Sequence, residues 1–131
     1  MSEPLQKILY VEDEPDIRDI AQLVLENVGG FDVLAVDGGQ KALQQINDFA
    51  PDLVLLDAMM PEMDGPTTFK EIRKLPNFKE IPIAFLTAKL MDDDIKGYLA
   101  LGAIGVIAKP FDPMTLSEQV RDLWSKATAI T

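Results

Sequence analysis

The chain has 131 residues, of which 47% are hydrophobic and 26% charged, and this balance predicts one globular domain over residues 1–131. It contains no cysteine or histidine, which excludes disulfides, His- or Cys-ligated zinc and histidine-based catalytic triads within the chain. A net charge of −10 argues against nucleic acid or an anionic membrane as a direct partner. No apolar run approaches the ~20 residues of a membrane span, and the N-terminus lacks a signal peptide, so we expect a cytoplasmic protein.

Strand and helix signals alternate along the first half of the chain. Residues 8–11 form an apolar run that predicts a strand, and Pro15 then suits the first turn of a helix. The predicted apolar stripe of this helix comprises Ile17, Ile20, Ala21, Val24 and Val28. Residues 31–36 predict a second strand and residues 42–49 a second helix.

The same alternation occurs three more times in the second half. Strands are predicted at residues 53–56, 81–86 and 103–108, and helices are marked by apolar residues within 69–75, 91–99 and 116–124. The folded core is expected at about residues 7–126, with a short tail at 127–131. Five strand–helix units predict an α/β fold, a doubly wound five-stranded parallel sheet with five helices on its two faces.

Polar residues follow four of the predicted strands directly. They are Glu12 and Asp13, Asp57, Thr87, and Lys109. Ligands of open parallel sheets bind at the carboxyl ends of the strands, so these side chains are expected at one edge. Crowded carboxylates either retain a proton or bind a hard divalent cation, and oxygen ligands alone suit Mg²⁺, Mn²⁺ or Ca²⁺. Mg²⁺ is the preferred interpretation, because it needs few carboxylates and completes its shell with water and phosphate oxygens.

The remaining polar groups at this edge favour phosphoryl chemistry. Lys109 offers a positive charge and Thr87 a hydroxyl donor, both of which stabilise a transferred phosphoryl group. Asp57 can itself be the acceptor, because carboxylate nucleophiles form aspartyl phosphates.

In this order, these segments resemble the receiver domain of two-component response regulators. The matching segments are Glu12-Asp13, Asp57–Gly65 (DAMMPEMDG), Thr87-Ala88 and Lys109-Pro110-Phe111. The likeness covers residues 7–126. It implies a flavodoxin-like, CheY-like sheet in the order 2-1-3-4-5 and a cis Lys109–Pro110 bond.

The resemblance also implies roles and partners. Asp57 would accept a phosphoryl group from a phosphohistidine of a sensor histidine kinase or a histidine phosphotransfer protein, while Thr87 and Lys109 would contact that group. Mg²⁺ would be held by Glu12, Asp13, Asp57 and the backbone carbonyl of Met59. Phosphorylation would alter the face of helix four, strand five and helix five. That face would bind a downstream protein, since no output domain is expected. A homodimer is also possible.

One position departs from the usual pattern of the family, and two others are positions that tune the stability of the aspartyl phosphate in the family. Val106 stands where the family often has an aromatic that rotates inward with Thr87. Met59 and Lys89, two residues after Asp57 and Thr87, occupy positions that set the lifetime of the aspartyl phosphate. Met59 cannot orient an attacking water, so slow self-dephosphorylation is predicted.

Other interpretations compete with a phosphorylation switch. The chain could be a Mg²⁺-dependent phosphohydrolase with Asp57 as nucleophile, a receiver-like binding module that does not switch, or a flavin-binding protein of similar topology. Residue by residue, Glu12–Glu14 could be a solvated turn, Lys109 a structural ion-pair partner of Asp57, and Thr87 a helix cap. Asp92–Asp94 are more simply the start of helix four than a metal cluster.

Overall fold

Five apolar runs form the strands of one parallel sheet in the order β2-β1-β3-β4-β5, as predicted. The computed structural model describes residues 4–128. Its strands are β1 Lys7–Val11, β2 Asp32–Val36, β3 Leu53–Asp57, β4 Ile83–Thr87 and β5 Gly105–Ala108. Its helices are α1 Pro15–Asn27, α2 Gly39–Phe49, α3 Gly65–Lys74, the short 3-10 helix η1 Pro76–Phe78, α4 Asp92–Leu101 and α5 Leu116–Thr128. The sequence pattern does not predict η1.

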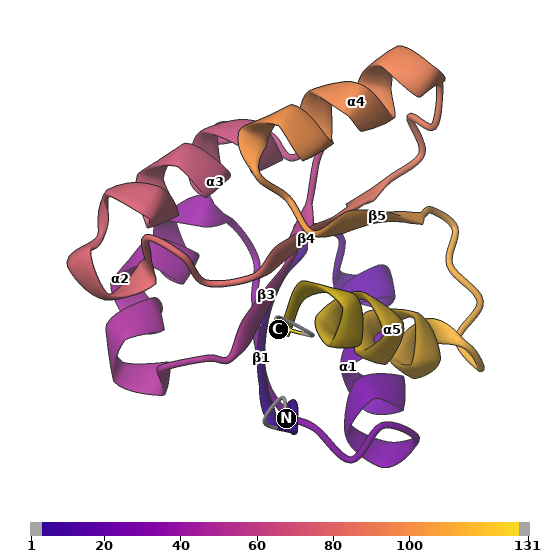
Figure 1. Ribbon diagram of the computed structural model, residues 1–131. Coiled ribbons are helices and arrows are strands. Elements are labelled where there is room, and N and C mark those ends of the chain that lie inside the picture. Colours follow the sequence, from indigo (N-terminus) through magenta and orange to yellow (C-terminus); the bar gives the residue numbers. More distant parts are fainter. Residues whose placement is uncertain (1–3, 129–131) are drawn as a thin grey trace.

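The helices cover both faces of the sheet, α1 and α5 on one side and α2, α3 and α4 on the other (Figure 1). Successive side chains of a strand point to opposite faces. In β3, Leu53 and Leu55 therefore pack with α1 and α5, whereas Val54 and Leu56 pack with the other helices. Every residue of β3 and β4 is buried, which explains their nearly continuous apolar sequence.

α1 forms where it was predicted, but the predicted stripe is wrong in part. Ala21 and Leu25 are fully buried, whereas Ile20 and Val28 are 47% and 51% exposed. Leu25 is absent from the predicted stripe. Apolar residues occur around much of this helix, so several stripes satisfy helical spacing, and docking against the sheet and α5 selects the buried one.

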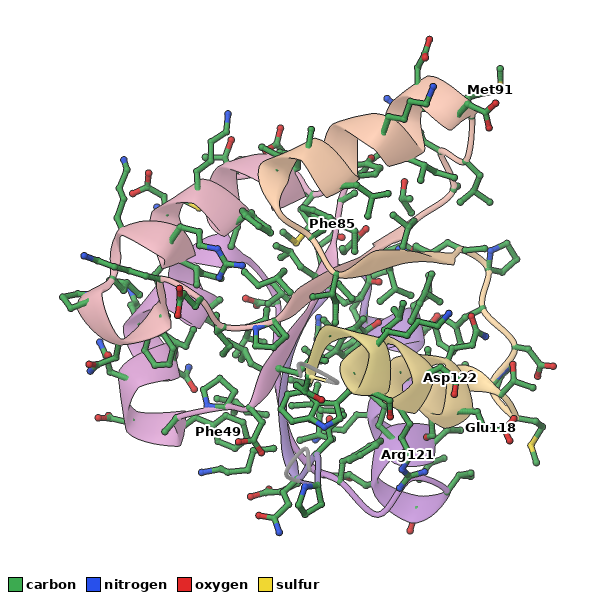
Figure 2. The ribbon with its side chains drawn as sticks, viewed as in Figure 1. Phe49, Phe85, Met91, Glu118, Arg121 and Asp122 are labelled. Atoms are coloured by element: carbon green, nitrogen blue, oxygen red, sulfur yellow. The ribbon has the colours of Figure 1, made fainter. Side chains whose placement is uncertain are left out.

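α4 packs loosely, since none of its residues is fully buried. Met91 was predicted within the helix but is its N-cap residue, and Figure 2 shows it at the outer end of α4. Met91 and Leu99 are exposed rather than in the core. Half-buried Tyr98 connects α4 to the sheet, with its ring centroid 4.7 Å from that of Phe85.

Several element ends differ from the prediction. β4 begins at Ile83, after Pro82, which lacks an N–H for the ladder. β5 begins at Gly105, because residues 102–104 form the turn out of α4, where Gly102 has φ +110°. α5 continues to Thr128, so residues 127 and 128 of the predicted tail are helical, while 129–131 lie outside the described residues. No helix within residues 4–128 is long and apolar enough to span a membrane.

Candidate functional site

The carboxyl ends of four strands place the predicted polar residues at one edge of the sheet. Asp57 and Thr87 end β3 and β4, while Glu12 and Lys109 directly follow β1 and β5. Backbone hydrogen bonds continue the ladder beyond the strands. The Glu12 N–H donates to the Val36 carbonyl at 3.0 Å and the Lys109 N–H to the Thr87 carbonyl at 2.9 Å. These side chains are therefore positioned by the sheet itself.

Three carboxylates converge at this edge. Glu12, Asp13 and Asp57 each offer one oxygen, and the three oxygens lie within 4.8 Å of one another. Glu12 and Asp57 are buried and Asp13 is half-buried. No second carboxylate group of this kind occurs within residues 4–128; Asp92–Asp94 instead form the acidic first turn of α4.

The Lys109 ammonium lies between two of these carboxylates. Its Nζ is 2.9 Å from Glu12 Oε1 and 3.3 Å from Asp57 Oδ2. The ion pair with Asp57 therefore exists, but the shorter contact and a hydrogen bond go to Glu12. The Lys109–Pro110 peptide bond is cis, as the resemblance implied.

Glu12 is also held by three residues to which the sequence pattern assigns no role at the site. The buried Tyr10 hydroxyl donates to Glu12 Oε1 at 3.3 Å, and the Glu14 N–H donates to Oε2 at 3.3 Å. The Arg18 guanidinium donates to the Glu12 carbonyl at 2.9 Å. Tyr10 could have been noticed from the sequence, because it is the one phenol in the otherwise aliphatic run of residues 8–11.

The two oxygens of Asp57 differ in their contacts. Oδ1 accepts the Met59 N–H at 3.2 Å. Oδ2 has no hydrogen bond, although the Lys109 ammonium lies near it. Within residues 4–128, it is the one buried side-chain oxygen or nitrogen that lacks a hydrogen-bond partner. A buried carboxylate oxygen without a hydrogen bond is costly. Asp57 Oδ2 is therefore available to contact a ligand or a cation that enters the cavity.

Burial and the neighbouring carboxylate set the protonation of this pair. Burial, together with the interaction with and repulsion from the neighbouring Glu12 carboxylate, raises the pKa of Asp57 to about 7. For Glu12, burial alone would raise the pKa, but the interactions with Asp57 and with the Lys109 ammonium outweigh burial and lower it. Below about pH 7, the pair therefore retains one proton, which resides on Asp57 rather than on Glu12.

Thr87 faces the same site but does not cap a helix. Its Oγ1 accepts the Lys89 N–H at 3.0 Å and lies 3.4 Å from the Tyr98 hydroxyl oxygen. Helix α4 begins only after Met91, so the interpretation of Thr87 as its cap is wrong. A cavity of about 340 Å³ opens beside Thr87 and is lined by Glu14, Ile17, Asp57, Met59, Thr87, Ala88, Lys109 and Pro110.

This fold, with a buried acidic cluster, a lysine and a threonine at its carboxyl edge, defines a CheY-like α/β domain. Residues 8–121 match the family model described as the response regulator receiver domain. The chain belongs to this family and is a receiver domain of two-component signal transduction.

Curated relatives and solved structures agree with this assignment. The chain is 37% identical to "Response regulator Rre1" of Synechocystis sp. over 98% of this chain and 55% of the relative. It is 36% identical to "Transcriptional regulatory protein CpxR homolog" of Haemophilus influenzae, over 95% and 53%. The chemotaxis protein CheY4 of Vibrio cholerae superposes with a TM-score of 0.84 at 29% identity, over 92% of this chain and 99% of that one. The chain thus spans about half the length of these curated relatives.

Proposed function

We propose that Asp57 accepts a phosphoryl group from a phosphohistidine of a sensor histidine kinase or a histidine phosphotransfer protein. An Asp57 carboxylate oxygen attacks phosphorus, and the phosphorus–nitrogen bond of the phosphohistidine breaks. The imidazole leaves with the electron pair and takes up a proton, and an aspartyl phosphate remains. The observation that carries this proposal is Asp57 Oδ2, a buried carboxylate oxygen without a hydrogen bond beside the Lys109 ammonium.

Two side chains of the same cavity support the transfer electrostatically. The Lys109 ammonium is placed to attract the phosphoryl oxygens, and the Thr87 hydroxyl is placed to donate to one of them. Both groups are positioned before reaction by strand ends, so little reorganisation is needed when the charge arrives.

The donor set fits Mg²⁺, with Mn²⁺ as the alternative. Glu12, Asp13, Asp57 and the backbone carbonyl of Met59 would hold it, all through oxygen. When bound, the cation supplies positive charge that offsets the carboxylates and the phosphoryl oxygens. Asp57 must then release its proton, so we expect binding to strengthen as pH rises through about 7.

We place the contact with a downstream protein on α4, β5 and α5. Leu90, Met91 and Leu99 expose apolar surface on and before α4, and α4 has no fully buried residue to hold it rigidly. The curated relatives include transcriptional regulators, of which this chain matches about half. The identity of the downstream partner, a homodimer and the cytoplasmic location stay predictions.

A phosphohydrolase is the second candidate, but the site lacks a residue that this activity commonly uses. Many aspartate-based hydrolases carry an acid/base carboxylate two residues after the nucleophile, whereas this chain has Met59, whose side chain is 57% exposed. A multiple-turnover assay with small phosphate esters separates the two functions. Stoichiometric uptake without turnover supports the receiver, and sustained release of inorganic phosphate supports the hydrolase.

Intact mass spectrometry with acetyl phosphate and Mg²⁺ tests the proposal directly. We expect an increase of about 80 Da, the mass of one phosphoryl group, which peptide mapping assigns to Asp57. Asp57→Asn should abolish uptake, and Asp52→Asn, an aspartate just before β3, is the matched control that should retain it. Uptake by the Asp57→Asn variant would place the acceptor elsewhere.

A further inference from the structure

Tyr98 brings a hydroxyl from α4 to the buried hydroxyl of Thr87 at the end of β4. The two oxygens lie 3.4 Å apart, and either can donate. Thr87 is 1% exposed, so its hydroxyl depends on protein partners. Neither the strand-end pattern nor the receiver resemblance assigns Tyr98 a role.

The hydrogen-bonding capacity of Thr87 makes the direction of this contact important. A threonine hydroxyl has one proton and two lone pairs. The Lys89 N–H already donates to Oγ1 at 3.0 Å and occupies one lone pair. When Tyr98 donates into the other, the Thr87 proton is free to point into the cavity that Asp57 also lines. When Tyr98 accepts instead, that proton turns away from the cavity.

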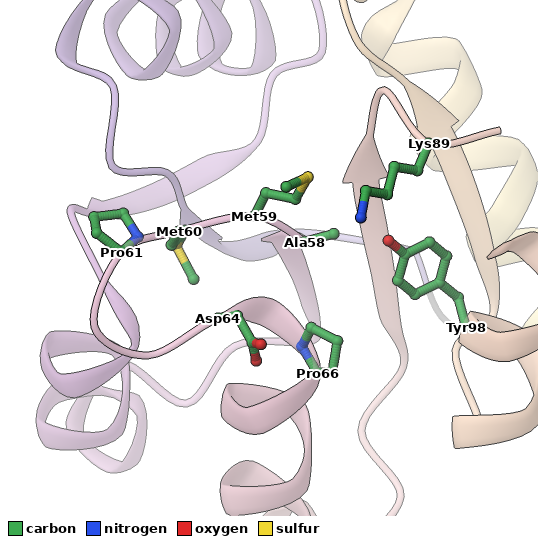
Figure 3. A pocket seen from close by; sticks show the side chains of 8 residues that line it. All are labelled: Ala58, Met59, Met60, Pro61, Asp64, Pro66, Lys89 and Tyr98. Carbon is green, nitrogen blue, oxygen red and sulfur yellow. The ribbon is translucent and has the colours of Figure 1, made fainter.

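The surroundings of Tyr98 favour its role as donor. Its ring is held against Phe85 at 4.7 Å, and Phe85 in turn stacks on Phe69 at 5.7 Å. In Figure 2, Phe85 lies between the sheet and the helices above it. Figure 3 shows the Lys89 amine and the Tyr98 hydroxyl pointing toward one another at the edge of a cavity of about 530 Å³. An ammonium is positively charged and only donates, so its position favours the orientation in which the Tyr98 proton points away from Lys89 and toward Thr87.

We propose that Tyr98 is a positioning residue for phosphoryl transfer: its hydroxyl donates to Thr87 Oγ1 and so aims the Thr87 proton at the incoming phosphoryl group. This inference rests on the proposed function of Asp57. The 3.4 Å contact is long for a hydrogen bond between hydroxyls, and such contacts tighten as charge develops on the reacting group. Val106, which pairs with Phe85 from β5, carries no hydroxyl, so α4 supplies this contact.

A double-mutant cycle on the complete chain tests the role. The rate of phosphoryl uptake from acetyl phosphate with Mg²⁺ is measured by intact mass for the unsubstituted chain, Tyr98→Phe, Thr87→Ala and the double variant. Tyr98→Phe keeps the ring and its contact with Phe85. It should slow uptake about three- to tenfold, the effect of one hydrogen bond in the transition state. In the Thr87→Ala background, Tyr98→Phe should have no further effect.

Two further variants complete the test. Thr87→Ser retains the hydroxyl and should restore the sensitivity to Tyr98→Phe, whereas Lys96→Ala, an exposed position on the same helix, should leave uptake unchanged. Equal uptake by Tyr98→Phe and the unsubstituted chain, with Asp57 labelled in both, overturns this inference alone. If Tyr98→Phe slows uptake equally in the unsubstituted chain and in the Thr87→Ala variant, the inference is also overturned, since the effect is then merely structural. No uptake by the unsubstituted chain overturns the proposed function and this role with it.

Discussion

Lys109 Nζ lies 2.9 Å from Glu12 Oε1, although 97 positions separate the two residues in the chain. The same ammonium is 3.3 Å from Asp57 Oδ2. One ammonium therefore contacts two buried carboxyl groups at the carboxyl ends of β1, β3 and β5. The hydrogen bond with Glu12 and attraction to both carboxylates outweigh burial and raise the pKa of Lys109, so it stays charged at neutral pH.

Lys109→Met should lower the free energy of unfolding by about 3 kcal/mol at pH 8, because it leaves buried carboxylates without their partner. The loss should be smaller at pH 5, where Asp57 is protonated. Urea denaturation without metal measures both values. The control is Lys41→Met, whose ion pair with Asp37 is exposed and should contribute less than about 1 kcal/mol. Equal losses for the two variants would contradict the importance of the buried contact.

Stability should fall as pH rises from about 4.5 to about 7 in the presence of EDTA. The pKa of Asp57 is raised from 3.8 to about 7, so in this window the folded chain retains a proton that the unfolded chain has released. This stabilisation is complete at acid pH and is lost as pH passes through about 7. The lowered pKa of Glu12 acts in the opposite sense only at more acid pH. Urea denaturation as a function of pH should show the slope, and Asp57→Asn should remove it; an unchanged slope would contradict the assignment to Asp57.

Mg²⁺ should raise the melting temperature of the chain at pH 8, because it binds the folded carboxylate cluster and not the unfolded chain. A free Mg²⁺ concentration of ten times Kd should add about 1.4 kcal/mol to the free energy of unfolding. Asp13→Asn should abolish most of this shift yet barely change stability without metal, since Asp13 is half-buried and takes no part in the Lys109 ion pairs. Differential scanning calorimetry with and without Mg²⁺ measures both effects. A full Mg²⁺ shift in Asp13→Asn would exclude this carboxylate as a ligand.

Tyr10→Phe should cost about 1 to 2 kcal/mol of stability, because it removes a buried donor to Glu12 Oε1 without changing the shape of the core. We also expect weaker Mg²⁺ binding, since Glu12 is then held by fewer contacts. Isothermal titration calorimetry measures the affinity. Unchanged affinity together with the expected loss of stability would restrict Tyr10 to a purely structural role.

The aspartyl phosphate should be long-lived in the presence of Mg²⁺. The Met59 thioether borders the cavity that Asp57 lines, and it has no group that could orient a water for attack. Met59→Asn or Met59→Glu should therefore shorten the lifetime, because both side chains can hold a water. Loss of the phosphoryl mass with time after removal of acetyl phosphate measures this. A lifetime of only seconds for the unsubstituted chain would contradict the prediction.

Much of the architecture follows from local patterns in the sequence. Strand and helix periodicities repeat five times, and the carboxyl ends of parallel strands must share one edge of the sheet. Glu12, Asp57, Thr87 and Lys109 each stand at such an end, so their gathering follows once the sheet is parallel. The strand order came from the family resemblance, because periodicity alone does not determine which strands are neighbours.

The tertiary structure decided which groups touch one another. It placed Lys109 nearer to Glu12 than to Asp57, left Asp57 Oδ2 without a hydrogen bond, and brought the hydroxyls of Tyr10 and Tyr98 to the site. It also buried Leu25 rather than Ile20 in α1. Each of these outcomes depends on distances and side-chain directions between segments far apart in the chain. Local periodicity carries no such information, because it records which residues share a face and not what that face meets.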